Sequence, residues 1–250
     1  MISVCAISGK EPIYLKPWLH HLKRISQVKE INIVFTNVDY DRPQSITALG
    51  AIRIKSMFSP NYYNFSKWRN QSLEMARQEW ILVLDIDEFL SYEFIEELPS
   101  LLSQDCNFIK ARRIDFWNKD SYREDLKHQK YYLFKNNVNV FFTRPLHEVL
   151  CIKHGDKVED VHPIDRIEDK LKIAYAKSPV YHYSFIKRQK EGTDRIALYK
   201  TIRYLNDFDQ KGLNEFSRED LAAHIKRESE KGKVLKKFEG KHPQELEEIL

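Results

Sequence analysis

Short apolar runs alternate with amphipathic segments along the first third of the chain. The runs are rich in valine, isoleucine and leucine and predict buried β-strands at residues 2–8, 31–36, 52–55 and 80–84. Apolar side chains recur at helical spacing after Pro12 and again at about residues 66–78, which predicts a helix in each place. This alternation is typical of a doubly wound α/β sheet, whose ligands bind beyond the carboxyl ends of its strands.

The pattern changes after residue 107. Strands predominate up to about residue 184, with candidates at 108–109, 131–134 and 138–143. From residue 186 onward the chain is highly charged and mostly helical in its periodicity. Because no internal repeat or flexible linker divides these parts, we expect one α/β domain with a helical extension at its C-terminal end.

Glycine is scarce, with only 7 residues in a chain of 250. The two closest glycines are eight positions apart, so the chain has neither a G-x-G-x-x-G turn nor a G-x-x-x-x-G-K phosphate loop. If the protein binds a nucleotide, other groups must hold the phosphates. The 42% share of hydrophobic residues also excludes a collagen-like or broadly disordered chain.

The charge balance argues against a nucleic-acid-binding protein. The 41 basic residues are nearly matched by 37 acidic ones, which leaves a net charge of +4. Residues 187–241 carry 15 basic and 10 acidic side chains. Such a segment is typical of a solvated helical face, and contact with an anionic membrane surface or acceptor is the alternative.

The cysteines and the N-terminus suggest where the protein works. Three scattered cysteines favour reduced thiols over a disulfide framework or a zinc cluster. No apolar run approaches the roughly 20 residues of a membrane span, and no signal-like segment begins the chain. We therefore expect a cytoplasmic protein, with peripheral contact at the inner face of a membrane through its basic C-terminal helices as an option.

An Asp-x-Asp motif follows the fourth expected strand. Strand periodicity places Asp85 and Asp87 on the same side, where the sheet opens to solvent. Two carboxylates this close repel each other unless a cation lies between them, and oxygen ligands suit Mg²⁺ or Mn²⁺. The structural alternative is a pair of acids that cap a helix beginning near Glu93.

Several ordered segments carry a family resemblance. They read ISVCAISGKEPIYLKPWLHHL, FSKWRNQSLEMARQEWILVLDIDEFLS, RPLHEVL and SPVYHYSF, and they lie within residues 2–186. Taken together, they resemble the family 2 glycosyltransferases of the GT-A fold. The resemblance implies a mixed, mostly parallel sheet between helices, with a catalytic domain at 1–186 (a nucleotide-binding half at 1–90 and an acceptor-side half at 91–186) and a helical extension at 187–250.

The resemblance also implies a reaction. A sugar is transferred with inversion from a nucleotide-diphosphate donor, with a UDP-sugar as the expected donor, to a hydroxyl of a glycan, lipid-linked or other acceptor. A divalent cation, Mn²⁺ or Mg²⁺, assists. Asp87 matches the metal-ligand aspartate of the family, and Asp85 matches the aspartate that faces the donor ribose and diphosphate, with a share in the metal. His182 matches a late metal-ligand histidine, although a hydrogen-bonded packing role is its alternative.

Further residues match the donor-binding positions of the family. Arg69 and Asn70 match an Arg-Asn pair that approaches the nucleotide, and their alternative is an ordinary exposed pair on a helix. Other candidates follow the first two strands, where polar residues are expected to converge on the cleft. These are Ser8, Glu11, Asp39 and Asp41.

An inverting transfer needs a carboxylate that accepts the proton of the attacking hydroxyl. Glu148 matches the position of that base, and a salt bridge to Arg144 is its structural alternative. The preceding His147 is not followed by the second histidine of a zinc protease motif, which excludes that class.

Two other functions fit parts of the pattern. In a haloacid-dehalogenase-like phosphatase, Asp85 would be the nucleophile, Asp87 an acid/base, and residues 155–160 a second acidic motif. Phe89 and the position of the motif after the fourth strand weigh against this class. A non-catalytic α/β binding module is the second alternative, and the set of candidate catalytic side chains argues against it. The oligomeric state stays open.

Overall fold

The structure is a computed structural model of the whole chain, and it describes most of the expected α/β domain. The described residues are 1–9, 13–36, 52–58, 64–145, 148–153, 161–186, 234–247 and 250. Residues 187–233, which form most of the expected helical extension, lie outside this set.

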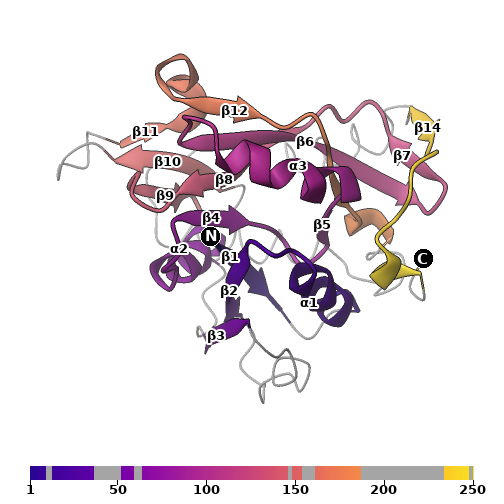
Figure 1. The fold of residues 1–250 in the computed structure, drawn as a ribbon, viewed down its shortest axis with the longest axis horizontal. Helices are drawn as coiled ribbons and strands as arrows, with labels where there is room; N and C mark the ends of the chain where they lie inside the picture. The colour runs from indigo at the N-terminus through magenta and orange to yellow at the C-terminus, as the bar shows by residue number, and fades with distance from the viewer. Residues whose placement is uncertain are drawn as a thin grey trace, which may run out of the picture.

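Four parallel strands form one half of the main sheet (Figure 1). They are β1 (Ile2–Ser8), β2 (Val28–Phe35), β3 (Arg53–Phe58) and β4 (Trp80–Val83). β1 lies between β4 and β2, and β3 pairs with the far side of β2. Because β1, β2 and β4 are buried on both faces, their sequences are largely apolar rather than strictly alternating, and Ser3, Glu30 and Asn32 within them are also buried. The four predicted strands are confirmed.

Antiparallel pairing extends the sheet beyond β4. β8 pairs antiparallel with β4, and β6 pairs antiparallel with β8. Near one end of β6 the sheet continues through β7 to β14, while β12 runs parallel to β6 at its other end. The strands are β6 (Phe108–Asn118), β7 (Ser121–Arg123), β8 (Gln129–Lys135), β12 (Ile173–Tyr175) and β14 (Leu235–Lys237).

Two short strands connect the Asp-x-Asp turn to the antiparallel half. β5 (Glu88–Leu90) begins just after β4 ends, and it pairs antiparallel with β13 (Val180–His182). β13 also pairs in parallel with β6. In this register, His182 lies opposite Glu88 on one side and Asp115 on the other.

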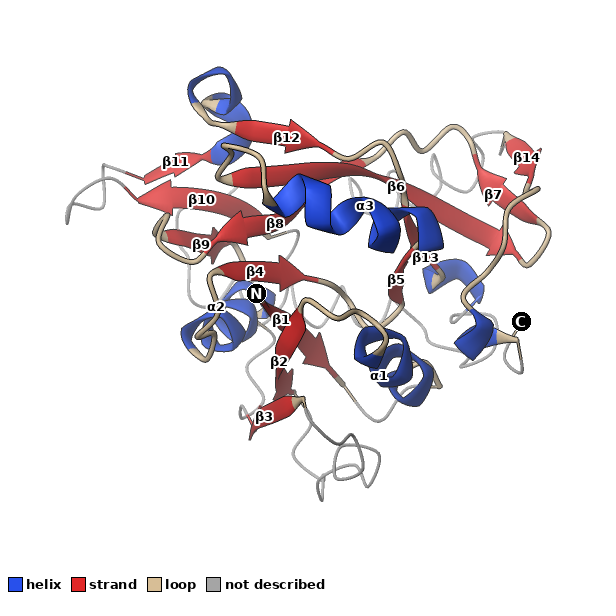
Figure 2. Ribbon diagram, in the orientation of Figure 1, coloured by secondary structure: helices blue, strands red, loops and turns tan. Residues whose placement is uncertain are grey.

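A second, three-stranded sheet packs beside the helix α2 (Phe65–Glu74) (Figure 2). It comprises β9 (Val140–Thr143), β10 (Val149–Lys153) and β11 (Val161–Pro163), all antiparallel. Two 3₁₀ turns follow it, η3 (Ile164–Arg166) and η4 (Glu168–Lys170). Together they complete the strand-rich region that the sequence predicts after residue 107.

Helices cover the sheet and fix its two faces. They are α1 (Leu15–Lys23), α2 (Phe65–Glu74) and α3 (Tyr92–Leu102). Asn64 caps α2, and the Ser91 hydroxyl caps α3 by accepting from the backbone N–H of Phe94 at 3.1 Å. Asp85 and Asp87 therefore do not cap α3, which removes the structural alternative for these two carboxylates.

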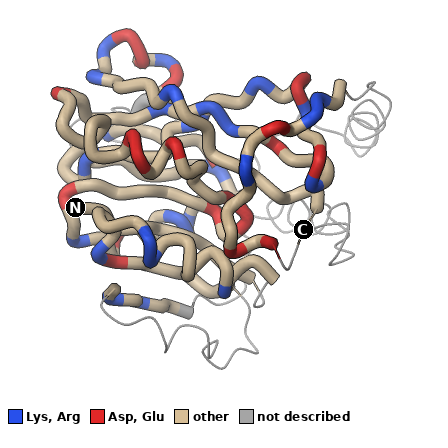
Figure 3. The backbone as a smooth tube through the Cα atoms, turned by 45° about the vertical axis from the view of Figure 1, so that its right-hand side comes forward, with Lys and Arg blue, Asp and Glu red and all other residues tan. Residues whose placement is uncertain are grey.

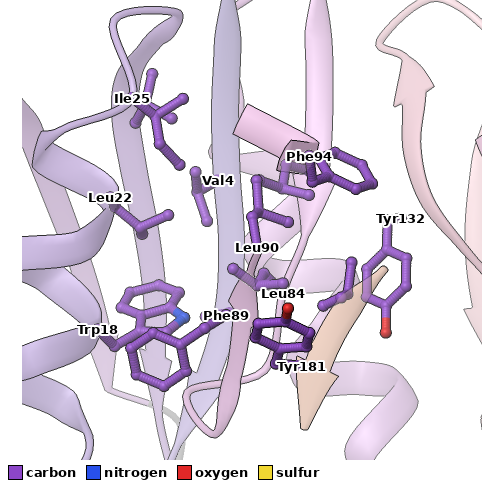
Figure 4. Close-up of a cluster of buried hydrophobic side chains, with 14 of the residues drawn as sticks. Val4, Trp18, Leu22, Ile25, Leu84, Phe89, Leu90, Phe94, Tyr132 and Tyr181 are labelled. Atoms are coloured by element: carbon purple, nitrogen blue, oxygen red, sulfur yellow. The ribbon is translucent and has the colours of Figure 1, made fainter. Parts of the chain in front are cut away.

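The side chains of β1 alternate between two cores. Val4 joins the larger core with α1 and α3, whereas Cys5 joins a smaller core against which Leu73 of α2 packs. Figure 4 shows part of the larger core, in which Trp18 and Leu22 of α1 lie beside Val4. The helices thus lie on opposite faces, as a layered α/β sheet requires.

The described C-terminal residues are not α-helical. They form β14 and the 3₁₀ turn η5 (Gln244–Leu246), and Leu246 is fully buried. The ring of Phe238 packs edge-on against Phe116 of β6 at 4.7 Å between centroids. The helical extension expected over residues 187–250 is therefore not found in the part of it that the structure describes.

The described chain carries charges of both signs in alternation along its length (Figure 3). None of its described helices is both long enough and apolar enough to cross a bilayer.

A buried carboxylate ties the parallel strands together at their amino ends. Glu30 on β2 is 1% exposed and accepts hydrogen bonds from the Ser3 hydroxyl (2.6 Å) and the backbone N–H of Arg77 (2.9 Å). Its other oxygen lies 2.6 Å from the ammonium of Lys55 on β3. Burial alone would raise the pKa of Glu30, but the bonds from Lys55 and Ser3 outweigh it and the pKa is lowered.

We expect Glu30→Gln to lower the free energy of unfolding by about 2–4 kcal/mol at pH 7, because Lys55 loses its buried partner. Since the folded pKa is lowered, the stabilisation is present above the unfolded pKa of about 4.3 and is lost as the pH falls through the folded pKa. Urea unfolding at pH 7 and at pH 3.5 measures both effects. Glu79→Gln, whose side chain is 65% exposed, is the matched control. A mutant indistinguishable from this control would contradict the assignment.

Candidate active site

The Asp-x-Asp motif forms a turn between β4 and β5. β4 ends at Val83, and the backbone N–H of Glu88 donates to the carbonyl of Asp85 at 2.8 Å. The Glu88 carboxylate in turn accepts from the backbone N–H of Asp85 at 3.0 Å. Strand periodicity therefore does not govern the motif, and Asp85 and Asp87 make separate sets of contacts.

Arg69 bridges Asp85 and Glu148. Its Nη2 atom lies 2.7 Å from Oδ1 of Asp85, and its Nε atom donates to Oε1 of Glu148 at 2.7 Å. The arginine side chain is 11% exposed and its guanidinium lies over the ring of Phe142 at 5.5 Å. The structure thus brings three predicted site residues together, and the salt-bridge partner of Glu148 is Arg69 rather than Arg144.

The bridge shifts the pKa of both its aspartate and its arginine. Burial alone would raise the pKa of Asp85, but the charges of Arg69 and Lys130 lower it well below its usual range. Burial would also lower the pKa of Arg69, and the carboxylates of Asp85 and Glu148 raise it instead. Both groups therefore stay charged at neutral pH. The Nη1 atom of Arg69 is buried and has no hydrogen-bond partner within the described residues.

A second cation approaches Asp85 from β8. The ammonium of Lys130 lies 3.5 Å from Asp85 and 2.8 Å from the fully buried carboxylate of Glu88. Tyr132 also donates to Glu88 at 3.0 Å. Sequence analysis missed Lys130 and Tyr132. The spacing of Lys130 and Tyr132, two residues apart in a strand, indicates that both lie on the same face. Only the pairing of β8 with β4, however, places that face beside the motif.

Asp87 faces His182, which is held by a second aspartate. The Nε2 atom of His182 lies 3.8 Å from Oδ1 of Asp87, whereas its Nδ1 atom lies 2.5 Å from Oδ1 of Asp115. The side chain of Asp87 is 9% exposed, and its carbonyl accepts from the backbone N–H of Tyr183 at 2.9 Å. Arg113 contacts both oxygens of Asp115, at 3.2 Å each. Asp115 and Arg113 also went unnoticed in the sequence.

The donor set of Asp87 and His182 suits a divalent cation that is completed by a substrate. In the described chain, no group of three or more His, Cys, Asp or Glu side chains could hold a metal by itself. Mg²⁺, however, is usually held by one or two carboxylates together with substrate phosphates. Two donors that each lie about 2.1 Å from one ion can be up to about 4.2 Å apart, so the 3.8 Å gap admits an ion. Asp85 already contacts two cations, and its share in the metal stays a prediction.

Two other predicted residues make backbone contacts. The carbonyl of Ser8, at the carboxyl end of β1, accepts from the backbone N–H of Thr36 at 2.9 Å. The amide of Asn70 donates to the carbonyl of Phe142 (2.9 Å) and accepts from its backbone N–H (2.7 Å). Both polar atoms of Asn70 thus tie α2 to the edge of β9. The predicted donor-binding residues Glu11, Asp39 and Asp41 lie outside the described residues.

Sequence comparison points to one family. The model for the family described as glycosyl transferase family 2 matches residues 3–155. A TPR repeat-containing protein of Synechococcus elongatus is 28% identical over 196 residues. The alignment covers 77% of this chain and 45% of that protein, so this chain spans less than half the length of that relative.

Several solved structures align with parts of this chain at low sequence identity. S. aureus TarS 1–349 aligns with a TM-score of 0.48 at 13% identity, over 74% of this chain and 61% of that one. Its complex with UDP-GlcNAc aligns with a TM-score of 0.48 at 13% identity, over 73% and 58%. HddC from Yersinia pseudotuberculosis gives a TM-score of 0.41 at 11% identity, over 73% and 93%. The described sheet and the family match agree with the predicted GT-A architecture, and they favour it over the phosphatase alternative.

We expect Asn70→Ala to lower the free energy of unfolding by about 1–3 kcal/mol, because two hydrogen bonds to the backbone of Phe142 are lost. Affinity for UDP should stay within about twofold of the wild type, since the amide has no free polar atom for a nucleotide. Urea unfolding and calorimetric titration with UDP measure the two quantities. The exposed Asn137→Ala is the matched control. A large loss of UDP affinity at unchanged stability would instead assign Asn70 to the nucleotide.

Proposed function

Because the chain belongs to glycosyl transferase family 2, we propose that it transfers a sugar from a nucleotide-diphosphate donor to an acceptor hydroxyl, with inversion and with a divalent cation. One observation carries the proposal. The bridge from Glu148 through Arg69 to Asp85 joins the candidate base to the Asp-x-Asp turn, and Asp87 of the same turn faces His182 at the end of β13.

The donor diphosphate would be bound by cations rather than by a glycine loop. Arg69 and Lys130 both lie at Asp85, and the Nη1 atom of Arg69 supplies a buried donor with no described partner. A guanidinium matches the geometry of phosphate oxygens. The expected donor is a UDP-sugar, whose ribose and base would lie toward Ser8 at the end of β1.

Asp87 and His182 would hold the cation, Mn²⁺ or Mg²⁺. When it is bound, the ion neutralises the charge that develops on the departing diphosphate. Asp87 would contribute a carboxylate oxygen and His182 an imidazole nitrogen, and oxygens of the donor diphosphate suit the remaining positions.

Glu148 would act as the general base. Its carboxylate accepts the proton of the acceptor hydroxyl while the hydroxyl oxygen forms the new bond to the anomeric carbon. The bond from that carbon to the diphosphate oxygen breaks on the opposite face, and the nucleoside diphosphate leaves. Arg69 donates to Glu148 before the reaction, and it must loosen this contact for the carboxylate to take the proton. Attraction of Arg69 to the donor phosphates supplies that change.

The acceptor is the broadest part of the proposal. A hydroxyl on a glycan or a lipid-linked glycan fits the reaction. The chain spans 45% of the length of its TPR repeat-containing relative, and the match to that relative does not assign the acceptor.

We expect UDP with Mn²⁺ to raise the melting temperature of the protein more than UDP alone, because ligands that bind only the folded state stabilise it. Asp87→Asn should abolish the Mn²⁺-dependent part of the rise and the Mn²⁺-dependent hydrolysis of UDP-sugars. A thermal-shift screen of nucleoside diphosphates and their sugars, with and without Mn²⁺, measures the first effect. Asp105→Asn, on a side chain that is 84% exposed, is the control. Retained Mn²⁺ dependence in Asp87→Asn would refute the metal assignment, and phosphate release from a simple phosphomonoester would favour the phosphatase.

We expect Glu148→Gln to lower kcat by about 10²–10⁴-fold, because glutamine cannot take the proton of the hydroxyl. The Kd for the donor should change by less than about threefold, since a glutamine oxygen still accepts from Arg69. Steady-state kinetics and calorimetry separate the two quantities, with the partly exposed Glu124→Gln as the control. If donor binding collapses while kcat is preserved, Glu148 is a donor ligand and not the base.

A further inference from the structure

We propose that Asp115 is a positioning residue that holds His182 in the tautomer and orientation needed to bind the divalent cation beside Asp87. The inference rests on the proposed function. It adds to that function a residue of β6 that lies 67 positions from its histidine in the sequence.

The contacts of the two ring nitrogens differ. Nδ1 of His182 lies 2.5 Å from Oδ1 of Asp115, whereas Nε2 lies 3.8 Å from Oδ1 of Asp87. An ionised carboxylate only accepts hydrogen bonds, so the proton of the neutral ring lies on Nδ1. Nε2 then directs its lone pair toward Asp87. The 3.8 Å separation is too long for a hydrogen bond but leaves room for an ion.

Asp115 is itself rigidly held. It is 2% exposed, and Arg113 donates from Nε to its Oδ2 and contacts its Oδ1 through Nη2, both at 3.2 Å. The pairing of β13 with β6 places His182 directly opposite Asp115. The backbone register and the arginine thus orient the carboxylate, and the carboxylate orients the imidazole.

This arrangement is the one that metal-bound histidines require. A histidine ligand usually donates its second ring N–H to a carboxylate, which fixes the ring and makes the ligating nitrogen more basic. Loss of such a carboxylate typically weakens metal binding by about 10–100-fold. A purely structural triad of Asp87, His182 and Asp115 would show no such effect.

The experiment measures Mn²⁺ binding rather than turnover. Mn²⁺ is titrated into the full chain in the presence of UDP, free Mn²⁺ is followed by its electron paramagnetic resonance signal, and pulsed spectra report ¹⁴N coupling from a bound imidazole. The variants are Asp115→Asn, Arg113→Gln and His182→Ala, each checked by circular dichroism and thermal melting. Glu245→Gln is the matched control, because Glu245 is a buried carboxylate that contacts a histidine outside the site, His21 at 3.5 Å, and also Arg24 at 2.8 Å.

We expect His182→Ala to abolish the imidazole ¹⁴N coupling and Asp115→Asn to weaken Mn²⁺ binding about 10–100-fold with a changed coupling. Arg113→Gln leaves the contact between Asp115 and His182 in place and should cause a smaller loss. It also keeps the test valid if Asp115→Asn does not fold. Glu245→Gln should bind Mn²⁺ like the wild type.

Two outcomes would overturn the inference. In the first, folded Asp115→Asn binds Mn²⁺ with wild-type affinity and coupling, so Asp115 is only structural. If Asp115→Asn does not fold, the same result in folded Arg113→Gln leads to the same conclusion. In the second, the wild type and His182→Ala bind Mn²⁺ with the same affinity and neither shows ¹⁴N coupling, so His182 is not a metal ligand. Neither result bears on the proposed transfer reaction. That proposal is refuted separately if the wild type turns over no nucleotide sugar.

Discussion

The site depends on the guanidinium of Arg69, which is held between Asp85 and Glu148. The two carboxylates come from different sheets, one from the turn after β4 and the other from the segment before β10. Without the arginine, Glu148 would lose its ion-pair partner and Asp85 would keep only Lys130 at 3.5 Å, which is strongly unfavourable for two partly buried negative charges. Since α2 packs against both β1 and β9, the bridge also fixes the small sheet relative to the parallel strands.

The same rule of charge compensation extends through the site. Glu88 is buried beside Lys130, and Asp115 is buried between Arg113 and His182. The side chains of Lys130 and Arg113 are already oriented before any ligand enters, so a diphosphate would meet fixed donors rather than flexible side chains. A site built on side-chain cations in this way needs no glycine loop, which accounts for a nucleotide-binding candidate with so few glycines.

Much of the fold could be predicted from local pattern. Buried parallel strands such as β1 and β4 are largely apolar because both of their faces are covered. The structure of the C-terminal end could not be predicted in this way, because β14 is a three-residue strand defined by its pairing with β7 rather than by its own sequence. The prediction that Asp85 and Asp87 share one side of a strand was wrong for a related reason. Hydrogen bonds between Asp85 and Glu88 form a turn, so the alternation of the preceding strand does not continue through the motif.

For the site, the sequence alone determined which residue types stand where a family resemblance expects them: Asp85, Asp87, Arg69, Glu148 and His182. It could not determine their partners. Arg69 rather than Arg144 pairs with Glu148, and Asp115 holds His182, because strands and helices distant in the chain bring these groups within 3 Å of each other. Such contacts are set by sheet register and helix packing. Only the tertiary structure decided them, because no short-range pattern records which strand lies beside which.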